Sequence, residues 1–260
     1  MLSSIKGEMK PKLTSELAEI LGMLVADGCI QKNYICLWGN ITEDKPYYDG
    51  TVATLFKKVF KIKIRTHEKI SNSVYGFYLC NKEIINFLSE NFNLKPGSKT
   101  YTVKVPEAIM ASNDTKIITA FIRGFADCDG YLNFDKRYGN YNKFNKRFNV
   151  YPRIVLISVS KELIEQLQYS LERIGIKGNI RSLLPRKDSE KTAYHLTIKG
   201  KTMLKMWMNL MGFNNPVHVT KYHIWKKFGL CPTRVNLFER EKILKGQINP
   251  YSYYKHGPVA

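Results

Sequence analysis

The chain has 260 residues, of which 44% are hydrophobic, so it can form one large or two small domains and is not wholly disordered. No apolar run has the length of a membrane span, and the first twelve residues lack the apolar core of a signal peptide, which predicts a soluble intracellular protein of the cytoplasm or an organelle matrix. The net charge of +19, with 16 Tyr and 13 Phe interleaved among the basic residues, favours nucleic acid over an anionic membrane surface as the partner.

The first part of the chain alternates between helical and strand patterns. Residues 13–27 have apolar positions at helical spacing, with Thr14 or Ser15 as the N-cap, and the helix ends at Asp27-Gly28. The segments that follow are a strand pair at 29–40, a helix from about Gly50 to 60, strands at 62–70 and 74–80, and a helix at 82–92. A Pro-Gly stretch then predicts a linker that extends to about residue 106.

The same order then repeats. The segments are a helix at 114–128 capped by Asn113 or Asp114, strands at 131–135 and 151–160, a helix at 161–175, strands at 176–184 and 191–199, and a helix at 201–212. This internal duplication predicts a first half at 1–105 and a second half at 106–212. Residues 213–260 lie outside the repeat and form an extension with helices expected at 217–228 and 235–246.

Two short stretches, ILGMLVADG at 20–28 and IRGFADCDG at 122–130, lie 102 positions apart and carry small residues at every fourth position. These small residues are Ala18, Gly22 and Ala26 in the first helix and Ala120, Gly124 and Cys128 in the second. Residues four apart share one helix face, so two such faces allow close contact between the backbones. We therefore expect the two helices to pack on each other.

Two packed helices would bring Asp27 and Asp129 together at their C-terminal ends, where free carbonyls also favour a cation. This set of oxygen ligands suits Mg²⁺. An Asp-Gly at a helix end is also a common turn, so one copy alone would indicate only structure. The duplicated context favours a metal or catalytic role for the pair. When the two motifs are aligned, Asp127 corresponds to Val25 and so has no acidic counterpart in the first half. Asp127 is therefore expected to be structural.

The paired motif resembles that of the LAGLIDADG homing endonucleases of the single-chain, two-repeat type. FIRGFADCDGYL is a very good match and LGMLVADG a good one, with Val25 departing from the frequent acid. The resemblance implies an α+β fold with two pseudo-symmetric αββαββα halves, packed through the motif helices, whose antiparallel sheets bind DNA. It also implies a site-specific, metal-dependent DNA endonuclease that cuts one phosphodiester in each strand of a long site.

The resemblance further assigns roles to residues of the motif. Asp27 and Asp129 would be catalytic and bind Mg²⁺, or Mn²⁺ as a substitute, with the main-chain carbonyls of Ala26 and Cys128 as supporting ligands. The family tends to place a basic residue at the end of the last strand of a half. Lys199 is the best match, although a solvated strand end explains it equally well. Non-equivalent halves predict an asymmetric target.

DNA contacts would come from alternate strand residues and from the basic, aromatic insertion at 135–149. The candidates on the strands are Gln31, Asn33, Tyr34, Trp38, Arg65, His67, Tyr75, Tyr78, Arg153, Arg181 and His195. Those in the insertion are Lys136, Arg137, Lys143, Lys146 and Arg147, in a hairpin or loop over the phosphates or in a disordered loop off the DNA. A slip of one residue exchanges the two faces of a strand, so the sequence does not show which alternate set faces DNA.

Alternative functions remain open. A splicing maturase that binds intron RNA, or a DNA-binding regulator that does not cleave, could use the same fold. Both motif acids favour the nuclease over the regulator, but a maturase could keep both. We expect a monomer with no obligate protein partner. The terminal residues disfavour an intein, and His218, His223 and Cys231 have no zinc-site spacing.

Overall fold

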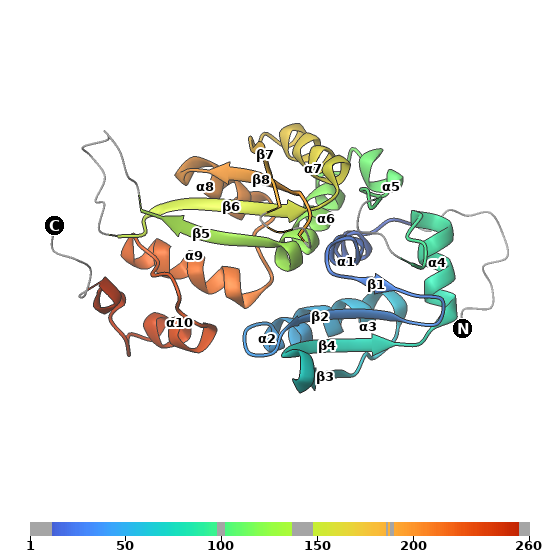
Figure 1. The fold of residues 1–260 in the computed structure, drawn as a ribbon, viewed down its shortest axis with the longest axis horizontal. Coiled ribbons are helices and arrows are strands. Elements are labelled where there is room, and N and C mark those ends of the chain that lie inside the picture. The colour runs from blue at the N-terminus through green and yellow to red at the C-terminus, as the bar shows by residue number, and fades with distance from the viewer. Residues whose placement is uncertain (1–11, 98–101, 137–147, 186, 188–189, 255–260) are drawn as a thin grey trace.

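The computed structural model describes residues 12–97, 102–136, 148–185, 187 and 190–254 and contains two four-stranded antiparallel sheets (Figure 1). The first sheet has the order β1-β2-β4-β3, made of β1 (Cys29–Ile30), β2 (Ile35–Asn40), β4 (Val74–Leu79) and β3 (Thr66–Lys69). The second has the order β5-β6-β8-β7, made of β5 (Gly130–Asp135), β6 (Tyr151–Ser158), β8 (Ala193–Lys199) and β7 (Asn179–Leu183). The shared strand order confirms the predicted α+β fold of two related halves.

The helices also follow the predicted repeat. The first half contains α1 (Ser15–Ala26), α2 (Lys45–Tyr47), a π-helical segment (Tyr48–Val52), α3 (Ala53–Phe60), a 3-10 turn (Ile70–Asn72) and α4 (Lys82–Phe92). The rest contains α5 (Glu107–Met110), α6 (Thr115–Asp129), α7 (Lys161–Arg173), α8 (Lys201–Leu210), α9 (Pro216–Phe228), α10 (Leu237–Leu244) and a 3-10 turn (Pro250–Tyr254). None of the helices in these ranges is long and apolar enough to cross a membrane.

The helix expected from about Gly50 begins earlier, at Lys45, because Pro46 fits the first turn of a helix and Asp44 accepts the Tyr48 N–H through its carbonyl. The other helix starts are set by side-chain caps. Thr14 accepts a hydrogen bond from the Leu17 N–H, and Asp114 accepts one from the Lys116 N–H. These two caps fix where the motif helices begin.

Helices α1 and α6 pack backbone against backbone in the middle of the molecule (Figure 1). A Cβ atom added at Gly22 would lie 2.1 Å from the carbonyl oxygen of Phe121, and one added at Gly124 would lie 2.1 Å from that of Glu19. The two contacts are equivalent, since Phe121 and Glu19 each precede their own motif glycine by three residues. The contact between small residues is confirmed, and it relates the halves by a pseudo-twofold axis.

A buried polar cluster closes the helix pair. Glu19 is 3% exposed, forms an ion pair with Arg123 of α6 and accepts a hydrogen bond from the Asn214 amide at 2.5 Å. Arg123 also donates to the carbonyl of Met211. A buried carboxylate is tolerated only when it is paired and hydrogen-bonded, and here both halves and the extension contribute to that pairing.

The extension covers the edge of the second sheet. The Trp225 ring of α9 stacks on Phe134 of β5 with centroids 5.6 Å apart, and its indole N–H donates to the Val150 carbonyl. Arg240 of α10, itself 3% exposed, forms an ion pair at 2.5 Å with Glu43 in the segment that follows β2. The extension therefore joins a loop of the first half to the second half.

Replacing Arg240 by Met is expected to lower the free energy of unfolding by about 3 to 5 kcal/mol, because Glu43 would keep a largely buried charge without its partner. The Arg240 side chain also donates to Thr220 and to the Val235 carbonyl. Urea unfolding followed by circular dichroism measures the change. The double variant R240M/E43Q should recover part of the loss, since Gln can still accept the Leu237 N–H.

The control for this prediction is Lys58→Met, which removes the ion pair between Lys58 and Glu16 at 62% and 28% side-chain exposure. Exposed pairs contribute little, so we expect a change below about 1 kcal/mol. Equal losses for Arg240→Met and Lys58→Met would contradict the role given to the buried pair.

Candidate active site between the halves

The C-terminal ends of α1 and α6 lie together between the two sheets (Figure 1). Asp27 follows α1, donates its N–H to the Met23 carbonyl at 3.0 Å and has an exposed side chain. Asp129 is the last residue of α6 and is half-buried. Burial raises the pKa of the Cys128 thiol, and the charges of Asp27, Asp127 and Asp129 raise it further. Carboxylates from both halves therefore act on one group.

A cavity of about 260 Å³ opens beside these helix ends. Asp27, Asp44 and Asp127 line it together with Tyr48 and Lys221. Burial raises the pKa of Tyr48, and the charges of Cys128, Asp27 and Asp44 raise it further. Sequence reasoning missed Asp44 and Lys221, because the first lies in a loop and the second in the extension. The one available signal for Asp44 was its position before a Lys-Pro helix start.

Asp127 lies at the back of this cavity and is 3% exposed. Its Oδ2 accepts the Asn214 N–H at 2.9 Å, and its main-chain carbonyl accepts the Asn215 amide at 3.1 Å. Burial raises the pKa of the Asp127 carboxyl to about 8, although hydrogen bonds from the main-chain N–H groups of Asn214 and Asn215 oppose this shift. Asp127 thus holds the start of the extension against the motif helix, which agrees with the structural role expected for it.

Asn215 completes this connection. Its side-chain amide also donates to Asp44 Oδ1 at 2.9 Å, and its Oδ1 accepts the Val217 N–H as the N-cap of α9. One buried side chain therefore links the loop after β2, the second motif helix and the extension. This link fixes Asp44 on the wall of the cavity.

The buried His218 is expected to make the fold sensitive to acid. Burial lowers its pKa from 6.5 to about 3, and the charges of Lys221 and Arg240 lower it further. A lowered pKa means that the unfolded chain binds the proton first, so this stability is complete above pH 6.5 and is lost as the pH falls towards 3. Between pH 7.5 and 5 the loss should be about 2 kcal/mol relative to His218→Gln.

The comparison with His218→Gln is needed because Asp127 acts in the opposite direction. Its raised pKa stabilises the folded state as the pH falls below 8, in the same range. Urea unfolding of both proteins at several pH values isolates the histidine contribution as the difference between the two curves. Parallel curves would show that His218 does not stay neutral in the folded protein.

The oxygen donors at the helix ends suit a hard divalent cation. Two carboxylates and the carbonyls at the ends of two helices concentrate negative potential there, as the raised pKa of Cys128 also indicates. Within the described ranges, no group of three or more His, Cys, Asp or Glu side chains is arranged to hold a metal ion. Two carboxylates would therefore need main-chain carbonyls, such as those of Ala26 and Cys128, and solvent as further ligands.

The structure places Lys199 away from this cavity. Lys199 pairs with Arg153, which pairs with Asn133, whereas the strand begins beside the motif at Gly130. Asn133 lies three residues beyond Gly130 along β5, so the row of paired residues that contains Lys199 is about 10 Å from the start of the strand. Lys199 is exposed at the outer end of β8 and does not line the cavity with Asp27. The cation that does line it is Lys221.

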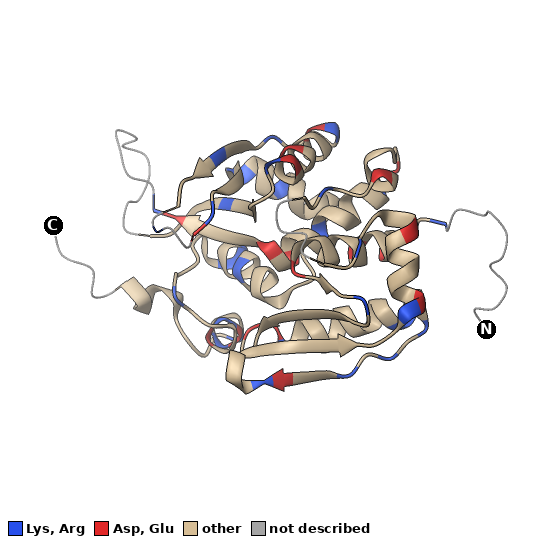
Figure 2. Ribbon diagram, turned by 45° about the vertical axis from the view of Figure 1, so that its right-hand side comes forward, with Lys and Arg blue, Asp and Glu red and all other residues tan. Residues whose placement is uncertain are grey.

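The register of the second sheet shows which alternate set of residues faces away from the core. Leu132, Ile154, Leu196 and Ile198 are at most 1% exposed and share the core face. The opposite face, which we call the open face, contains Asn133, Arg153, Arg181, His195 and Lys199. The DNA contacts predicted on the strands of this half, Arg153, Arg181 and His195, therefore lie on one surface. Figure 2 shows that basic residues are spread over both halves.

The first sheet has a corresponding open face. Trp38, His67 and Tyr78 lie on it, with Trp38 and His67 in ring contact at 5.2 Å and Tyr78 in contact with Tyr34 at 4.5 Å. Tyr75 lies on the opposite face and is 3% exposed, and its hydroxyl donates to Asp49 at 2.6 Å. The predicted DNA contact of Tyr75 is therefore wrong, because the alternation of β4 turns it into the core.

The other predicted contact residues lie at strand ends. Gln31 and Asn33 belong to the turn between β1 and β2, where the Gln31 N–H donates to the Tyr34 carbonyl. Arg65 is exposed just before β3, and the Lys136 ammonium lies 5.9 Å from the Tyr254 ring. Arg137, Lys143, Lys146 and Arg147 lie outside the described residues. Among the described residues, His218, His223 and Cys231 are not part of a group of three or more side chains that could hold a metal ion.

Comparison with known proteins supports the family resemblance. Residues 116–206 match the family described as the LAGLIDADG-like domain. The replication factor C small subunit of Methanocaldococcus jannaschii is 30% identical over 201 residues, which are 76% of this chain and 9% of that protein. The probable translation initiation factor IF-2 of the same organism is 27% identical over 210 residues, 78% of this chain and 16% of that protein. The chain thus spans less than a fifth of the length of these relatives.

Solved structures share the fold over most of the chain. The meganuclease I-SmaMI bound to DNA has a TM-score of 0.51 at 12% identity, covering 84% of this chain and 90% of its own. I-DmoI in complex with DNA and calcium has a TM-score of 0.50 at 14% identity, covering 75% and 88%. Residues 116–206 therefore match a LAGLIDADG-like domain, and the chain shares the fold of the single-chain homing endonucleases I-SmaMI and I-DmoI.

Proposed function

We propose that this protein is a site-specific double-strand DNA endonuclease that cuts one phosphodiester in each strand of a long, asymmetric site. The observation that carries the proposal is the close contact at Gly22 and Gly124, because it holds together the two helices whose C-terminal ends carry Asp27 and Asp129. Carboxylates that converge beside a packed interface repel each other, and such an arrangement usually serves metal binding or catalysis.

The charge pattern supports DNA as the substrate. The net charge is +19, and the open faces carry Arg, Lys, His and aromatic side chains on both sheets. Basic and aromatic residues on one surface suit a phosphate backbone and exposed base edges. The two open faces differ in their residues, and Val25 of the first motif corresponds to Asp127 of the second. These differences between the halves favour an asymmetric target.

Asp27 and Asp129 would hold a divalent ion, Mg²⁺ or Mn²⁺, with the carbonyls of Ala26 and Cys128. When bound, such an ion activates water and stabilises the charge that develops on the phosphate. The protein itself would position these groups. The close contact between α1 and α6 fixes the spacing of the two carboxylates, and the buried Asp127 holds the start of the extension beside the cavity.

The distribution of the relatives also supports the proposal. The matched segment is a small part of proteins whose names share no activity, a replication factor subunit, an initiation factor and an ATP synthase subunit. A segment that recurs in unrelated hosts behaves as an independent module. A nuclease that promotes its own insertion has this property.

The test is cleavage of a randomised plasmid library by the purified protein in Mg²⁺, with sequencing of the cut ends. The expected result is one long, non-palindromic consensus sequence with a cut in each strand. Tight binding to a DNA sequence without cuts in Mg²⁺ or Mn²⁺ would instead identify a regulator. Binding to intron RNA with faster splicing and no DNA cleavage would identify a maturase.

A further inference from the structure

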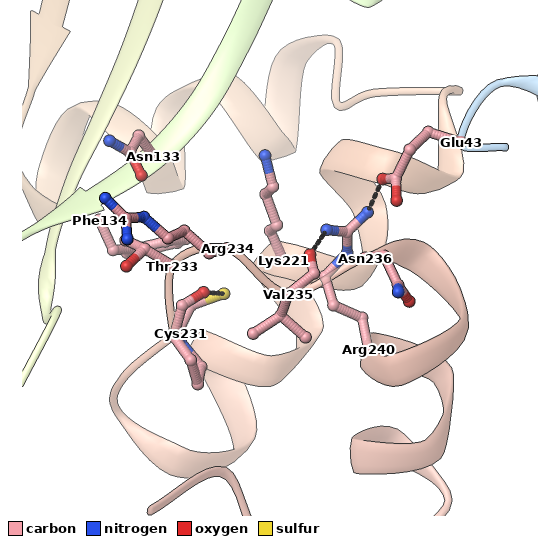
Figure 3. Close-up of a pocket in the computed structure, with 11 residues that line it drawn as sticks. Glu43, Asn133, Phe134, Lys221, Cys231, Thr233, Arg234, Val235, Asn236 and Arg240 are labelled. Carbon is pink, nitrogen blue, oxygen red and sulfur yellow. Dashed lines mark hydrogen bonds and ion pairs between the residues drawn. The ribbon is translucent and has the colours of Figure 1, made fainter. Parts of the chain in front are cut away.

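A second cavity of about 400 Å³ lies where the extension meets the edge strand β5 (Figure 3). It is lined by Asn133 of β5, Lys221 of α9, the segment 231–236 and Arg240 of α10. We call it the basic pocket. The acids of the proposed cleavage reaction, Asp27 and Asp129, do not line it, and no sequence motif predicts it.

The basic pocket has an excess of positive charge. Its cations are Lys221, Arg234 and Arg240, and its one carboxylate is Glu43. Glu43 is already engaged, since one oxygen pairs with Arg240 and the other accepts the Leu237 N–H at 2.7 Å. Within the described part of the chain, the side chains of Lys221 and Arg234 form neither a hydrogen bond nor an ion pair. Two positive charges are therefore uncompensated.

The arrangement of the cations points to an anion as ligand. Figure 3 shows the Lys221 side chain between those of Arg234 and Arg240. Burial lowers the pKa of Lys221, and the charge of Arg240 lowers it further, so the ammonium is less stable there than in water. Arg234 has a φ of 59°, which is uncommon for a residue with a side chain and often marks a functional site. An anion between the Lys221 and Arg234 side chains would stabilise the charged form of Lys221.

The location of the basic pocket identifies the kind of anion. Asn133 belongs to the open face of the second sheet, and β5 is an edge strand of that sheet. Lys221 lines both the basic pocket and the cavity that contains Asp27. The pocket thus lies beside the surface proposed to bind DNA and next to the proposed site of cleavage. We propose that Lys221, Arg234 and Asn133 bind one phosphate group of the DNA backbone, an inference that rests on the proposed function.

The experiment measures binding of a fluorescent 30-base-pair duplex of random sequence at several salt concentrations. Each phosphate contact contributes about −0.9 to the slope of log Kobs against log salt. Lys221→Met and Arg234→Gln should each make the slope less negative by about this amount. The control is Lys226→Met, which removes an exposed lysine from the same helix and should leave the slope unchanged. Thermal unfolding checks that each variant is folded, and Arg234 is exposed, so its replacement is not expected to disturb the core.

A slope for Lys221→Met and Arg234→Gln equal to that of Lys226→Met would overturn the inference, while the proposed function would stand if the wild type still cuts DNA. A wild type that neither binds nor cuts DNA would instead refute the proposed function. The remaining arm compares sodium phosphate with sodium chloride at equal ionic strength. One outcome is that phosphate stabilises the wild type but not Lys221→Met, while the salt dependence of DNA binding is the same in both proteins. This result would assign the pocket to free phosphate and refute the assignment to DNA.

Discussion

Asp129→Asn is expected to reduce double-strand cleavage at least about a thousandfold, and Asp27→Asn should do the same. Asparagine keeps the shape of the side chain but removes a negative charge, so the divalent ion of the proposed reaction would lose a ligand. A thousandfold loss corresponds to about 4 kcal/mol of transition-state stabilisation. Cleavage of the selected target under single-turnover conditions measures the rate.

Binding of DNA should persist in both variants, because the open faces of the sheets remain unchanged. A gel-shift assay in Ca²⁺ separates this property from cleavage. The control is Asp114→Asn, which makes the same change at the opposite end of α6, where Asn also serves well as an N-cap. If Asp129→Asn and Asp114→Asn cut both strands equally fast, Asp129 has no part in the reaction.

Gly124→Ala is expected to lower the free energy of unfolding by at least about 3 kcal/mol. The new Cβ would lie 2.1 Å from the Glu19 carbonyl oxygen, and both atoms belong to backbone-fixed positions that cannot rotate away. At an ordinary helical position the same change would stabilise the helix by up to about 1 kcal/mol. The sign of the effect in urea unfolding therefore tests the close helix contact.

Gly50→Ala is the matched control, since a Cβ at this helical glycine meets nothing within 4 Å. We expect its stability to equal or slightly exceed that of the wild type. Gly22→Ala should behave like Gly124→Ala, because it meets the Phe121 carbonyl at the same 2.1 Å. A stability gain in Gly124→Ala would mean that α1 and α6 do not touch through their backbones.

These predictions separate two roles of the motif. Its glycines set the distance between the helices, and its last acids supply the proposed chemistry. Loss of a glycine should therefore unfold the protein, whereas loss of an acid should leave a folded protein that binds DNA. A variant at Asp129 that unfolds would indicate that the carboxylate is mainly structural.

Local signals in the sequence determined the motif helices and the duplicated strand order, and they narrowed each helix cap to two neighbouring residues. Thr14 and Asp114 act within one helical turn, and the spacing of small residues is a property of one helix face, so neither depends on distant parts of the chain. The repeat added the relation between the halves, because the same pattern at a constant offset implied that the two helices meet.

Only the tertiary structure decided which residues face the open side of each sheet and which line the cavities. Alternation along a strand defines two sets of residues but does not show which set faces the core. Packing of β4 against the π-helical segment, where Tyr48 contacts Tyr75, placed Tyr75 in the core. Asp44, Asn215 and Lys221 come together from a loop and an extension far apart in the sequence. Their positions depend on long-range contacts that no local pattern encodes.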